Sequence, residues 1–496
     1  MNNLKKTLAL MAALVMSATA FVGCSDEKEE SKSSSSSSAS ESASESESAS
    51  ESESESESEA APAGKTTEVG EVKLATGGDK FTVAAWNGDD VPYLICQWKG
   101  ITDYKAGVEQ VANGEIEGVN FNNMGCQGGE ASEKYDNIFA GGEDMDVYMV
   151  EADWALKYIN DDTKTAPLSD LGFSDANFAE IYSYTDEIGK DKNGVRKGVS
   201  WQAAAGGFQY RADLAEQYLG VKSPEEMQAK IGTWDDFVAA AQTISEQSGG
   251  KTALADTLGG LWQAYACGRT QPWVVDNKVV IDDFCKNFAD TAKALWDCGG
   301  VTKNGQWTDE WTAAGTNDTC MGYFVSTWGY SGFGLTAAGG VGGETYGKWA
   351  VCQGPQAYYW GGTWMVVNPK TDNAQEAQDF IKSATVDNAQ MKAYASAKPE
   401  FVNNSVVMDE LIKADTVFNQ DITGNMKDNQ NIYAPLYENV QKIDFKGLIT
   451  EYDNPCKTNF VEAVKTEYLE GGKTWEETQE AFKDLAAEAL PDLDWE

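Results

Sequence analysis

Aromatic and polar side chains that stand beside glycine in loops have the types and spacing to bind a sugar. The apolar C–H faces of a sugar ring can stack on flat aromatic rings, and carboxylates or amides can hydrogen-bond its hydroxyls. Rigid aromatic side chains also lose little conformational entropy when they bind. The candidate binding residues are Trp86, Asn87, Asp89, Glu151, Asp153, Trp201, Trp328, Tyr330, Trp360 and Trp364.

Each candidate also has a purely structural interpretation. Glu151 and Asp153 follow an apolar run and could cap a helix instead of contacting a ligand. Three of the tryptophans could pack between halves of the fold, namely Trp201, Trp360 and Trp364. Other tryptophans lie on apolar helical stripes, and we assign them to the core: Trp234, Trp296 and Trp475.

The composition excludes several kinds of chemistry. The 496 residues contain no histidine, which removes Ser-His-Asp and Cys-His catalytic sites and the commonest transition-metal ligand. A net charge of −41 disfavours nucleic-acid binding, because that function needs a basic face. No complete nucleotide-binding or calcium-binding motif is present, so we expect neither a cofactor nor a metal.

One enzyme class passes this filter. Glycosidases use two carboxylates and often aromatic subsites, and the sequence is rich in both residue types, with 79 acidic residues and 16 tryptophans. An extracellular glycosidase therefore remains an alternative to a binding protein.

The N-terminus predicts export. Lys5 and Lys6 precede an uncharged run that ends at Gly23-Cys24, which resembles a lipoprotein signal peptide over residues 1–23 with Cys24 as the lipidated residue. Residues 25–64 contain no aliphatic Val, Ile, Leu or Met and no aromatic residue, and they alternate Ser and Glu over much of their length. Such a segment cannot bury enough apolar surface to fold, so residues 24–64 are predicted to be a lipidated, disordered tether.

Short apolar runs alternate with longer segments in the first part of the remaining chain. Residues 81–87, 119–124 and 146–150 are predicted strands, and the stretches between them are long enough for crossover helices. This order indicates βαβ units and a parallel sheet. Later helices are predicted to begin after Thr233, Asn373 and Thr474, the last with a Glu477 capping box.

Five motifs in this order resemble the extracellular solute-binding proteins of carbohydrate ABC importers, the group that includes maltose-binding protein. They are the strand and loop at 81–90, "GVSWQ" with "GFQYRADL" at 198–214, "TWDDF" at 233–237, "STWG" at 326–329, and "GGTW" at 361–364 with the helix at 373–383. The resemblance covers roughly residues 79–490. Ala203-Ala204-Ala205 replaces a polar contact of several relatives and Trp201 replaces their usual proline, so no relative's sugar specificity transfers.

The resemblance implies an α/β fold of two lobes with a ligand cleft between them. Lobe 1 would comprise residues 65–197 plus 358–420, and lobe 2 residues 198–357 plus 421–496. Crossings are expected near 197–201, 354–360 and 420–432. The "WNGDD" loop and "STWG" would bring Asp89 and Trp328 into the cleft from opposite lobes.

The resemblance also implies a function. We expect a lipid-anchored, monomeric protein on the outer face of the cell membrane that captures a carbohydrate, more specifically an oligosaccharide, and delivers it to the permease subunits of an ABC importer. The same fold with a peptide or polyamine ligand is a further alternative. Eight cysteines besides Cys24 could be free thiols or disulfides.

Overall fold

The structure is a computed structural model that describes residues 65–112, 115–126, 128–398, 400–414, 424–444 and 447–495. The predicted signal peptide, Cys24 and tether lie outside these residues. The described residues belong to one compact unit within residues 62–496. Within the described ranges, no helix is long and apolar enough to cross a membrane.

The first sheet has six strands in the order β2-β3-β1-β4-β12-β5. Three predicted strands form its parallel centre, as β1 (Phe81–Ala85), β3 (Val119–Asn123) and β4 (Val147–Glu151). The short β2 (Glu115–Ile116) lies at one edge. β12 (Thr363–Val367) returns from much later in the chain and pairs antiparallel with β4 and with β5 (Gly198–Ser200).

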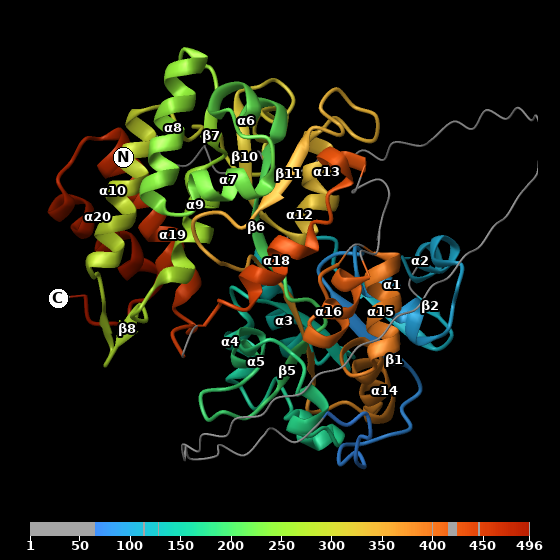
Figure 1. Cartoon of the computed structure of the whole chain (residues 1–496). Helices are drawn as coiled ribbons and strands as arrows, with labels where there is room; N and C mark the ends of the chain where they lie inside the picture. The colour runs from blue at the N-terminus through green and yellow to red at the C-terminus, as the bar shows by residue number, and fades with distance from the viewer. Residues whose placement is uncertain are drawn as a thin grey trace, which may run out of the picture. The chain divides into compact units, whose positions relative to one another are not determined.

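Helices from two distant stretches of the chain accompany this sheet (Figure 1). The early ones are α1 (Val91–Trp98), α2 (Tyr104–Ala112), α3 (Gly128–Gly141), α4 (Ala155–Ile159) and α5 (Ser183–Ile188). The late ones are α14 (Ala374–Thr385), α15 (Asn388–Ala397) and α16 (Ser405–Lys413), of which α14 and α15 contact α1.

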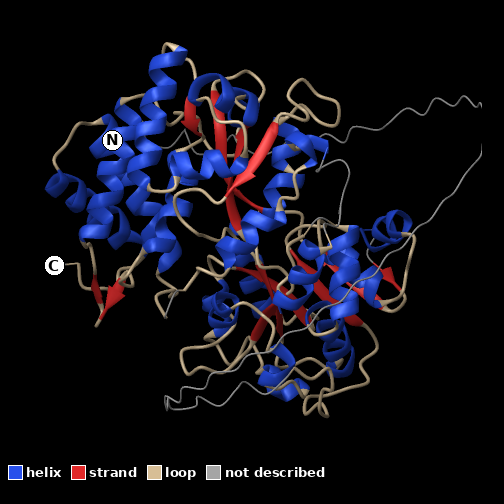
Figure 2. Cartoon of the chain, viewed as in Figure 1, coloured by secondary structure: helices blue, strands red, loops and turns tan. Residues whose placement is uncertain are grey.

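The second sheet has four strands in the order β11-β6-β10-β7. β6 (Gly206–Arg211) pairs antiparallel with β10 (Cys320–Ser326) and β11 (Trp349–Cys352), and β7 (Ala253–Ala255) runs parallel to β10. Figure 2, in which strands are red, shows the strands of the two sheets as two separate groups. A two-stranded hairpin, β8 (Val274–Val275) and β9 (Lys278–Val279), lies apart from both sheets.

Many helices surround the second sheet. Its apolar core includes residues from α6 (Ala212–Leu219), α7 (Pro224–Ile231), α8 (Trp234–Ser248), α9 (Leu258–Tyr265), α10 (Asp283–Asp297), α19 (Asp453–Ala463) and α20 (Trp475–Ala489). Three shorter helices are α11 (Asp309–Ala313), α12 (Thr327–Ser331) and α13 (Phe333–Ala337), and a further helix is α18 (Tyr433–Val440). The three tryptophans predicted as core are partly buried against this cluster, namely Trp234, Trp296 and Trp475.

Two of the three predicted helix caps are confirmed. The Thr233 side chain accepts a hydrogen bond from the Asp236 backbone N–H, and Thr474 forms the predicted capping box with Glu477. Asn373 precedes α14 but does not cap it. Its side-chain amide instead donates to the Lys80 carbonyl oxygen (3.0 Å), which ties α14 to the start of β1.

The chain crosses between the sheets at 201–205 and returns at 353–362. The first crossing differs from the predicted boundary between residues 197 and 198, because Ser200 pairs with Trp364 in the first sheet. The return crossing contains the predicted boundary at 357–358. A third exchange is expected near 420–432, of which residues 420–423 lie outside the described ranges, and α18 beyond this segment contacts β6 and β11.

All eight cysteines of the described part are free thiols. Burial raises the pKa of Cys285, Cys352 and Cys456 to about 12, so these three thiols stay protonated near neutral pH. Because the thiolate is the reactive form, such cysteines behave as core residues.

Candidate functional site

A cavity of about 800 Å³ is lined by loops at the ends of strands from both sheets and by the return crossing. Loops at the carboxyl ends of strands are the common ligand site of open α/β sheets. One wall comes mainly from the loop after β1 and carries most of the polar groups. The other comes from segments near α11, α12 and α13 and is aromatic.

The aromatic wall is a cluster of three tryptophans. The ring centroids of Trp307 and Trp328 lie 5.8 Å apart with an interplanar angle of 33°, and Trp360 lies 5.8 Å from Trp307 and 5.4 Å from Trp328. Phe333 lines the same wall. Trp307 is 60% exposed, which leaves a large indole surface open for a ligand.

Trp328 is held by the strand that precedes it. β10 is buried along its whole length and ends at Ser326, so α12 begins with Thr327 and places Trp328 at the end of the sheet. The Trp328 indole N–H donates to the Trp360 carbonyl oxygen (2.9 Å), and the Ser326 hydroxyl donates to the same oxygen (3.2 Å). These bonds fix the wall to the return crossing.

The sequence analysis missed Trp307. It lies in a loop after Gly305 and just before Thr308, which caps α11, and its backbone has a positive φ of 68°. A tryptophan beside glycine in a polar loop is the pattern used to choose the other candidates, so the same signal was present. Asp90, Tyr93, Gln202, Lys398 and Glu400 also line the cavity without having been predicted.

The polar wall begins directly after β1. Trp86, Asn87 and Asp89 line the cavity as the pattern predicts, and the Asn87 side-chain oxygen accepts from the Asp89 backbone N–H (3.2 Å). Lys398 donates to Asp90 Oδ1 and to the Asp89 carbonyl oxygen. Partial burial of the Asp89 carboxyl, together with repulsion from Asp90, raises its pKa, while Lys398 opposes the rise.

Two glutamates in the cavity favour their protonated forms. Burial raises the pKa of Glu151 to about 8, with a further rise from Asp153. Burial and nearby Asp90 raise the pKa of Glu400 to about 8. Glu151 Oε2 accepts a hydrogen bond from the Asp153 backbone N–H (2.9 Å). Glu400 Oε1 accepts from the Thr327 hydroxyl (2.6 Å), and this bond joins the segment after α15 to the start of α12.

Glycines bring the return crossing close to both walls. Gly361 and Gly362 have φ values of 68° and 107°, a region that favours residues without a Cβ. A Cβ on Gly361 would lie 3.4 Å from Glu151 Oε1 and 3.7 Å from Trp328 Nε1. At Gly361, therefore, only the backbone of the crossing lies between the Glu151 carboxyl and the Trp328 indole.

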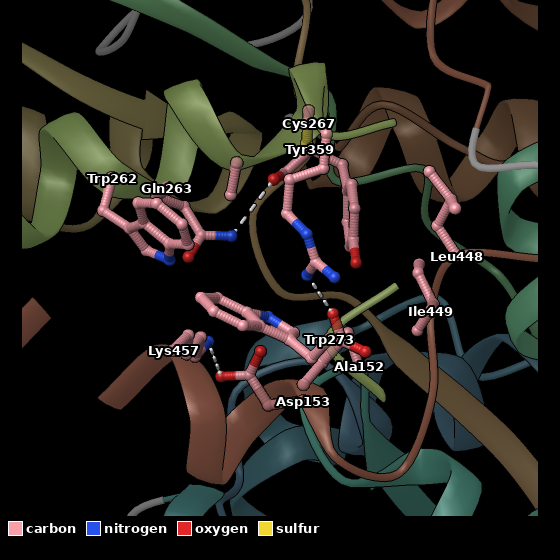
Figure 3. A pocket seen from close by; sticks show the side chains of 13 residues that line it. Ala152, Asp153, Trp262, Gln263, Cys267, Trp273, Tyr359, Leu448, Ile449 and Lys457 are labelled. Atoms are coloured by element: carbon pink, nitrogen blue, oxygen red, sulfur yellow. Dashed lines mark hydrogen bonds and ion pairs between the residues drawn. The ribbon is translucent and has the colours of Figure 1, made fainter. Parts of the chain in front are cut away.

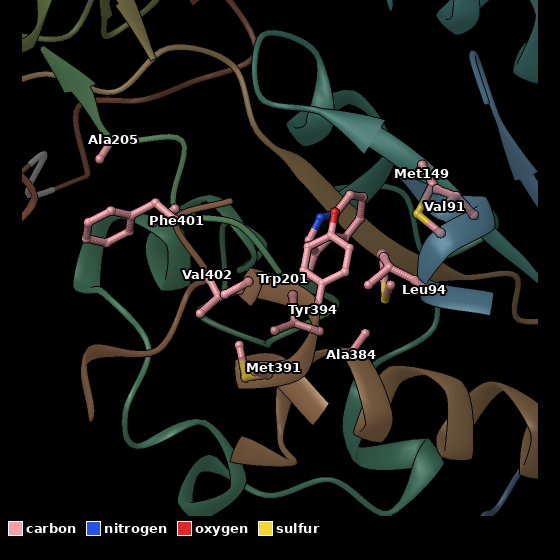
Figure 4. Close-up of a cluster of buried hydrophobic side chains, with 14 of the residues drawn as sticks. Val91, Leu94, Met149, Trp201, Ala205, Ala384, Met391, Tyr394, Phe401 and Val402 are labelled. Atoms are coloured by element: carbon pink, nitrogen blue, oxygen red, sulfur yellow. The ribbon is translucent and has the colours of Figure 1, made fainter. Parts of the chain in front are cut away.

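Three predicted site residues lie in the core instead of on the cavity. Trp201 is 1% exposed and belongs to the buried cluster that also contains Tyr394 and Val402 (Figure 4). Tyr330 is fully buried and donates its hydroxyl to the Val325 carbonyl oxygen (3.2 Å). Trp364 points inward from β12, where its indole N–H donates to the Thr185 carbonyl oxygen (2.9 Å).

Asp153 also lies away from the main cavity. It lines a separate cavity of about 60 Å³ and forms an ion pair with Lys457 of α19, with 2.5 Å between Oδ2 and Nζ (Figure 3). The expectation that Asp153 and Glu151 share one site is therefore not met, because successive turns after β4 direct the two carboxyls to different cavities.

The raised pKa of Glu400 predicts that stability depends on pH. This pKa is about 8 in the folded protein and ~4.3 in an unfolded chain, so between these pH values Glu400 is protonated in the folded state and ionised in the unfolded state. Its stabilising contribution is complete below ~4.3 and is lost as the pH rises through about 8.

The unfolding free energy of the wild type should therefore fall between pH 5 and pH 9. In Glu400→Gln this fall should be smaller by at least ~1.4 kcal/mol, the equivalent of one pKa unit. Glutamine keeps an acceptor for the Thr327 hydroxyl. Urea titrations of both proteins at the two pH values measure the difference, and equal losses would contradict a buried, protonated Glu400.

Comparisons with known proteins agree with this architecture. A family model described as bacterial extracellular solute-binding protein matches residues 101–419. The chain is similar to a crystal structure titled extracellular solute-binding protein family 1, with a TM-score of 0.68 and 17% identity over 83% of this chain and 100% of that one. A search of curated proteins finds no match.

Two further similar structures come from bifidobacteria. The galacto-N-biose/lacto-N-biose I-binding protein of Bifidobacterium longum has a TM-score of 0.61 and 16% identity over 84% of this chain and 98% of that one. The ABC-transporter-associated binding protein of B. animalis subsp. lactis has a TM-score of 0.59 and 18% identity over 83% of this chain and 98% of that one. These likenesses establish the two-lobe fold of periplasmic binding proteins, and the family match establishes that the chain belongs to the bacterial extracellular solute-binding proteins.

Proposed function

We propose that this protein captures an oligosaccharide in the 800 Å³ cavity and delivers it, unchanged, to an ABC importer. The observation that carries the proposal is an exposed tryptophan surface that lines the same cavity as several carboxyls and amides. Trp307 and Trp328 would stack on sugar ring faces, and Asp89, Asn87 and Glu151 would bind hydroxyls. The permease subunits of the importer are the proposed partner, and the protein would act as a monomer.

Cavity size supports a ligand larger than one sugar ring. Ligand pockets commonly enclose ~300–1,000 Å³, so about 800 Å³ lies in the upper part of that range. In addition, several aromatic side chains line the cavity, so more than one sugar ring could stack there. Two of the similar structures hold disaccharides according to their titles, lacto-N-biose in one and β-1,6-galactobiose in the other.

The aromatic geometry favours stacking over a cation box. A cation site surrounds an ammonium with ring faces, but Trp307, Trp328 and Trp360 contact one another, with all three pairs of centroids within 5.8 Å. No space remains between them for a cation, and the open surface of the cluster is its outer face. This arrangement supports a sugar over a polyamine.

A thermal-shift screen tests the choice of ligand. The panel is maltose, maltotriose, lacto-N-biose, β-1,6-galactobiose, spermidine and trialanine. A ligand that binds only the folded state raises the melting temperature with its concentration, so at least one neutral sugar should do so. A rise with spermidine or trialanine alone would replace the oligosaccharide proposal with the corresponding alternative.

Glu151 and Glu400 give the glycosidase alternative its only specific support, because a raised pKa is typical of a catalytic acid. However, burial and neighbouring carboxyls account for the raised pKa values of both glutamates, which are about 8, so these values do not by themselves indicate catalysis. We expect the best sugar of the panel to remain intact during prolonged incubation with the protein. Reducing ends above the buffer background would move the assignment to an enzyme.

The N-terminal Val22-Gly23-Cys24 junction supports a lipid anchor at Cys24. Metabolic labelling with an acyl-chain analogue is expected to mark the wild-type protein and to leave Cys24→Ala unlabelled, and Cys24→Ala should no longer fractionate with membranes. Absence of label from the wild-type protein would contradict the anchor.

A further inference from the structure

A buried carboxyl lies behind the aromatic wall, outside the cavity. Asp256 follows β7 and is 0% exposed, and Asp256 Oδ2 accepts a hydrogen bond from the Trp311 indole N–H (2.8 Å). Thr257 donates its hydroxyl to the same oxygen (3.2 Å). A buried carboxyl is costly unless donors reach it, so the indole N–H and Asp256 hold each other in place.

Trp311 is fixed at two further points. Its backbone N–H donates to the Thr308 hydroxyl (3.2 Å) at the start of α11, and its carbonyl oxygen accepts from the Tyr323 hydroxyl (2.9 Å) on β10. The Trp311 ring is 1% exposed and therefore belongs to the core. Its position is set by the second sheet through β7 and β10.

Two residues of the cavity wall rest on the Trp311 ring. Phe333 stacks on it, with centroids 3.8 Å apart and an interplanar angle of 14°. Trp307 contacts its edge at 4.8 Å and 67°. The residue before a helix cap often packs in this way on the first turn of the helix, and here the contact supports an exposed tryptophan with a positive φ of 68°.

We propose that Asp256 is a positioning residue for ligand binding, which acts through Trp311 to hold Trp307 and Phe333 in the cavity wall. The proposal rests on the proposed function, because it assumes that this wall binds the ligand. It assigns a role to a buried group that does not touch the cavity. An apolar residue at position 256 would fill the same space but would give the Trp311 indole N–H no acceptor.

The test compares three single variants with calorimetry, using the tightest-binding neutral sugar of the panel. Asp256→Ala removes the acceptor and is expected to weaken binding at least tenfold. Asp256→Asn keeps an acceptor oxygen and should stay within about threefold of the wild type. Trp311→Phe keeps an aromatic ring but lacks the N–H, so it should weaken binding like Asp256→Ala and serves if that variant folds poorly.

A double-mutant cycle separates positioning from general loss of stability. Once Trp307 is absent, Asp256 still positions Phe333 but no longer Trp307, so Asp256→Ala should cost less in a Trp307→Ala background than the tenfold expected in the wild type. Full additivity of the two effects would overturn the proposal. So would wild-type affinity in both Asp256→Ala and Trp311→Phe.

Near-ultraviolet circular dichroism gives a readout that needs no ligand. The near-ultraviolet signal that arises from the neighbouring rings of Trp307, Trp311 and Trp328 should change in Asp256→Ala. In Asp256→Asn it should match the wild-type signal. An unchanged spectrum in Asp256→Ala would overturn the positioning role by itself. If the spectrum changes as expected but the wild type binds no sugar of the panel, the positioning of the wall stands and the proposed function fails.

Discussion

Trp328→Ala is expected to weaken binding of the best sugar by ~2–4 kcal/mol, or about thirty- to several-hundredfold in Kd. The substitution removes a ring of the aromatic wall and the hydrogen bond to the Trp360 carbonyl oxygen, so Trp307 and Trp360 lose a shared neighbour. Trp328 is only partly buried, and its loss should lower stability less than the ~3–5 kcal/mol typical of a core tryptophan.

Trp296→Ala is the matched control for this variant. Trp296 lies in α10, partly buried against the core of the second sheet and under the Lys303 ammonium (4.3 Å from the ring centroid), and it does not line the cavity. The Trp296→Ala protein should lose some stability and keep wild-type affinity for the sugar. A Trp328→Ala protein that melts far lower yet binds normally would assign Trp328 to the core.

Asp89→Ala is expected to weaken binding by ~1.5–3 kcal/mol, the range for a hydrogen bond to a charged group. Asp89 is exposed and lines the same cavity as the aromatic wall, while Lys398 donates to its backbone carbonyl oxygen. Since the raised pKa of Asp89 reflects an unfavourable ionised form, its removal should not lower the melting temperature of the ligand-free protein.

Asp297→Ala provides the control for a lost carboxylate. Asp297 ends α10 in an exposed ion pair with Lys293, where such pairs contribute little to stability. Its affinity should equal that of the wild type in the same calorimetric titration. Equal affinities of Asp89→Ala and the wild type would remove Asp89 from the proposed site.

Local patterns in the sequence predicted much of the fold. The apolar runs at 81–87 and 146–150 became β1 and β4, because strands buried on both faces of a parallel sheet need continuous apolar residues. The segment at 119–124 became β3, in which Val119 and Phe121 are buried and the asparagines are not. Capping at Thr233 and Thr474 was also readable, since a cap depends on residues within one turn. Crossing points were less accurate, because only pairing across the chain shows that Ser200 belongs with Trp364.

The cavity was predicted less completely than the strands. Alternation along a strand decides which side chain points inward. The strands that pair with β12 come from far earlier in the chain, so a local pattern could not show that Trp364 is buried. Lys398 and Glu400 follow α15, far from the other lining residues in sequence. No local pattern connects them with Asp90, so only the folded chain brings these charges together.

Calorimetric titration of the purified protein with the neutral sugars of the panel shows whether the cavity binds an oligosaccharide. We expect saturable binding of at least one oligosaccharide, with most of that affinity lost in Trp328→Ala and retained in Trp296→Ala. Saturable binding of spermidine or trialanine with no heat from any sugar would contradict this expectation, as would a sugar affinity that is equal in the wild type and Trp328→Ala.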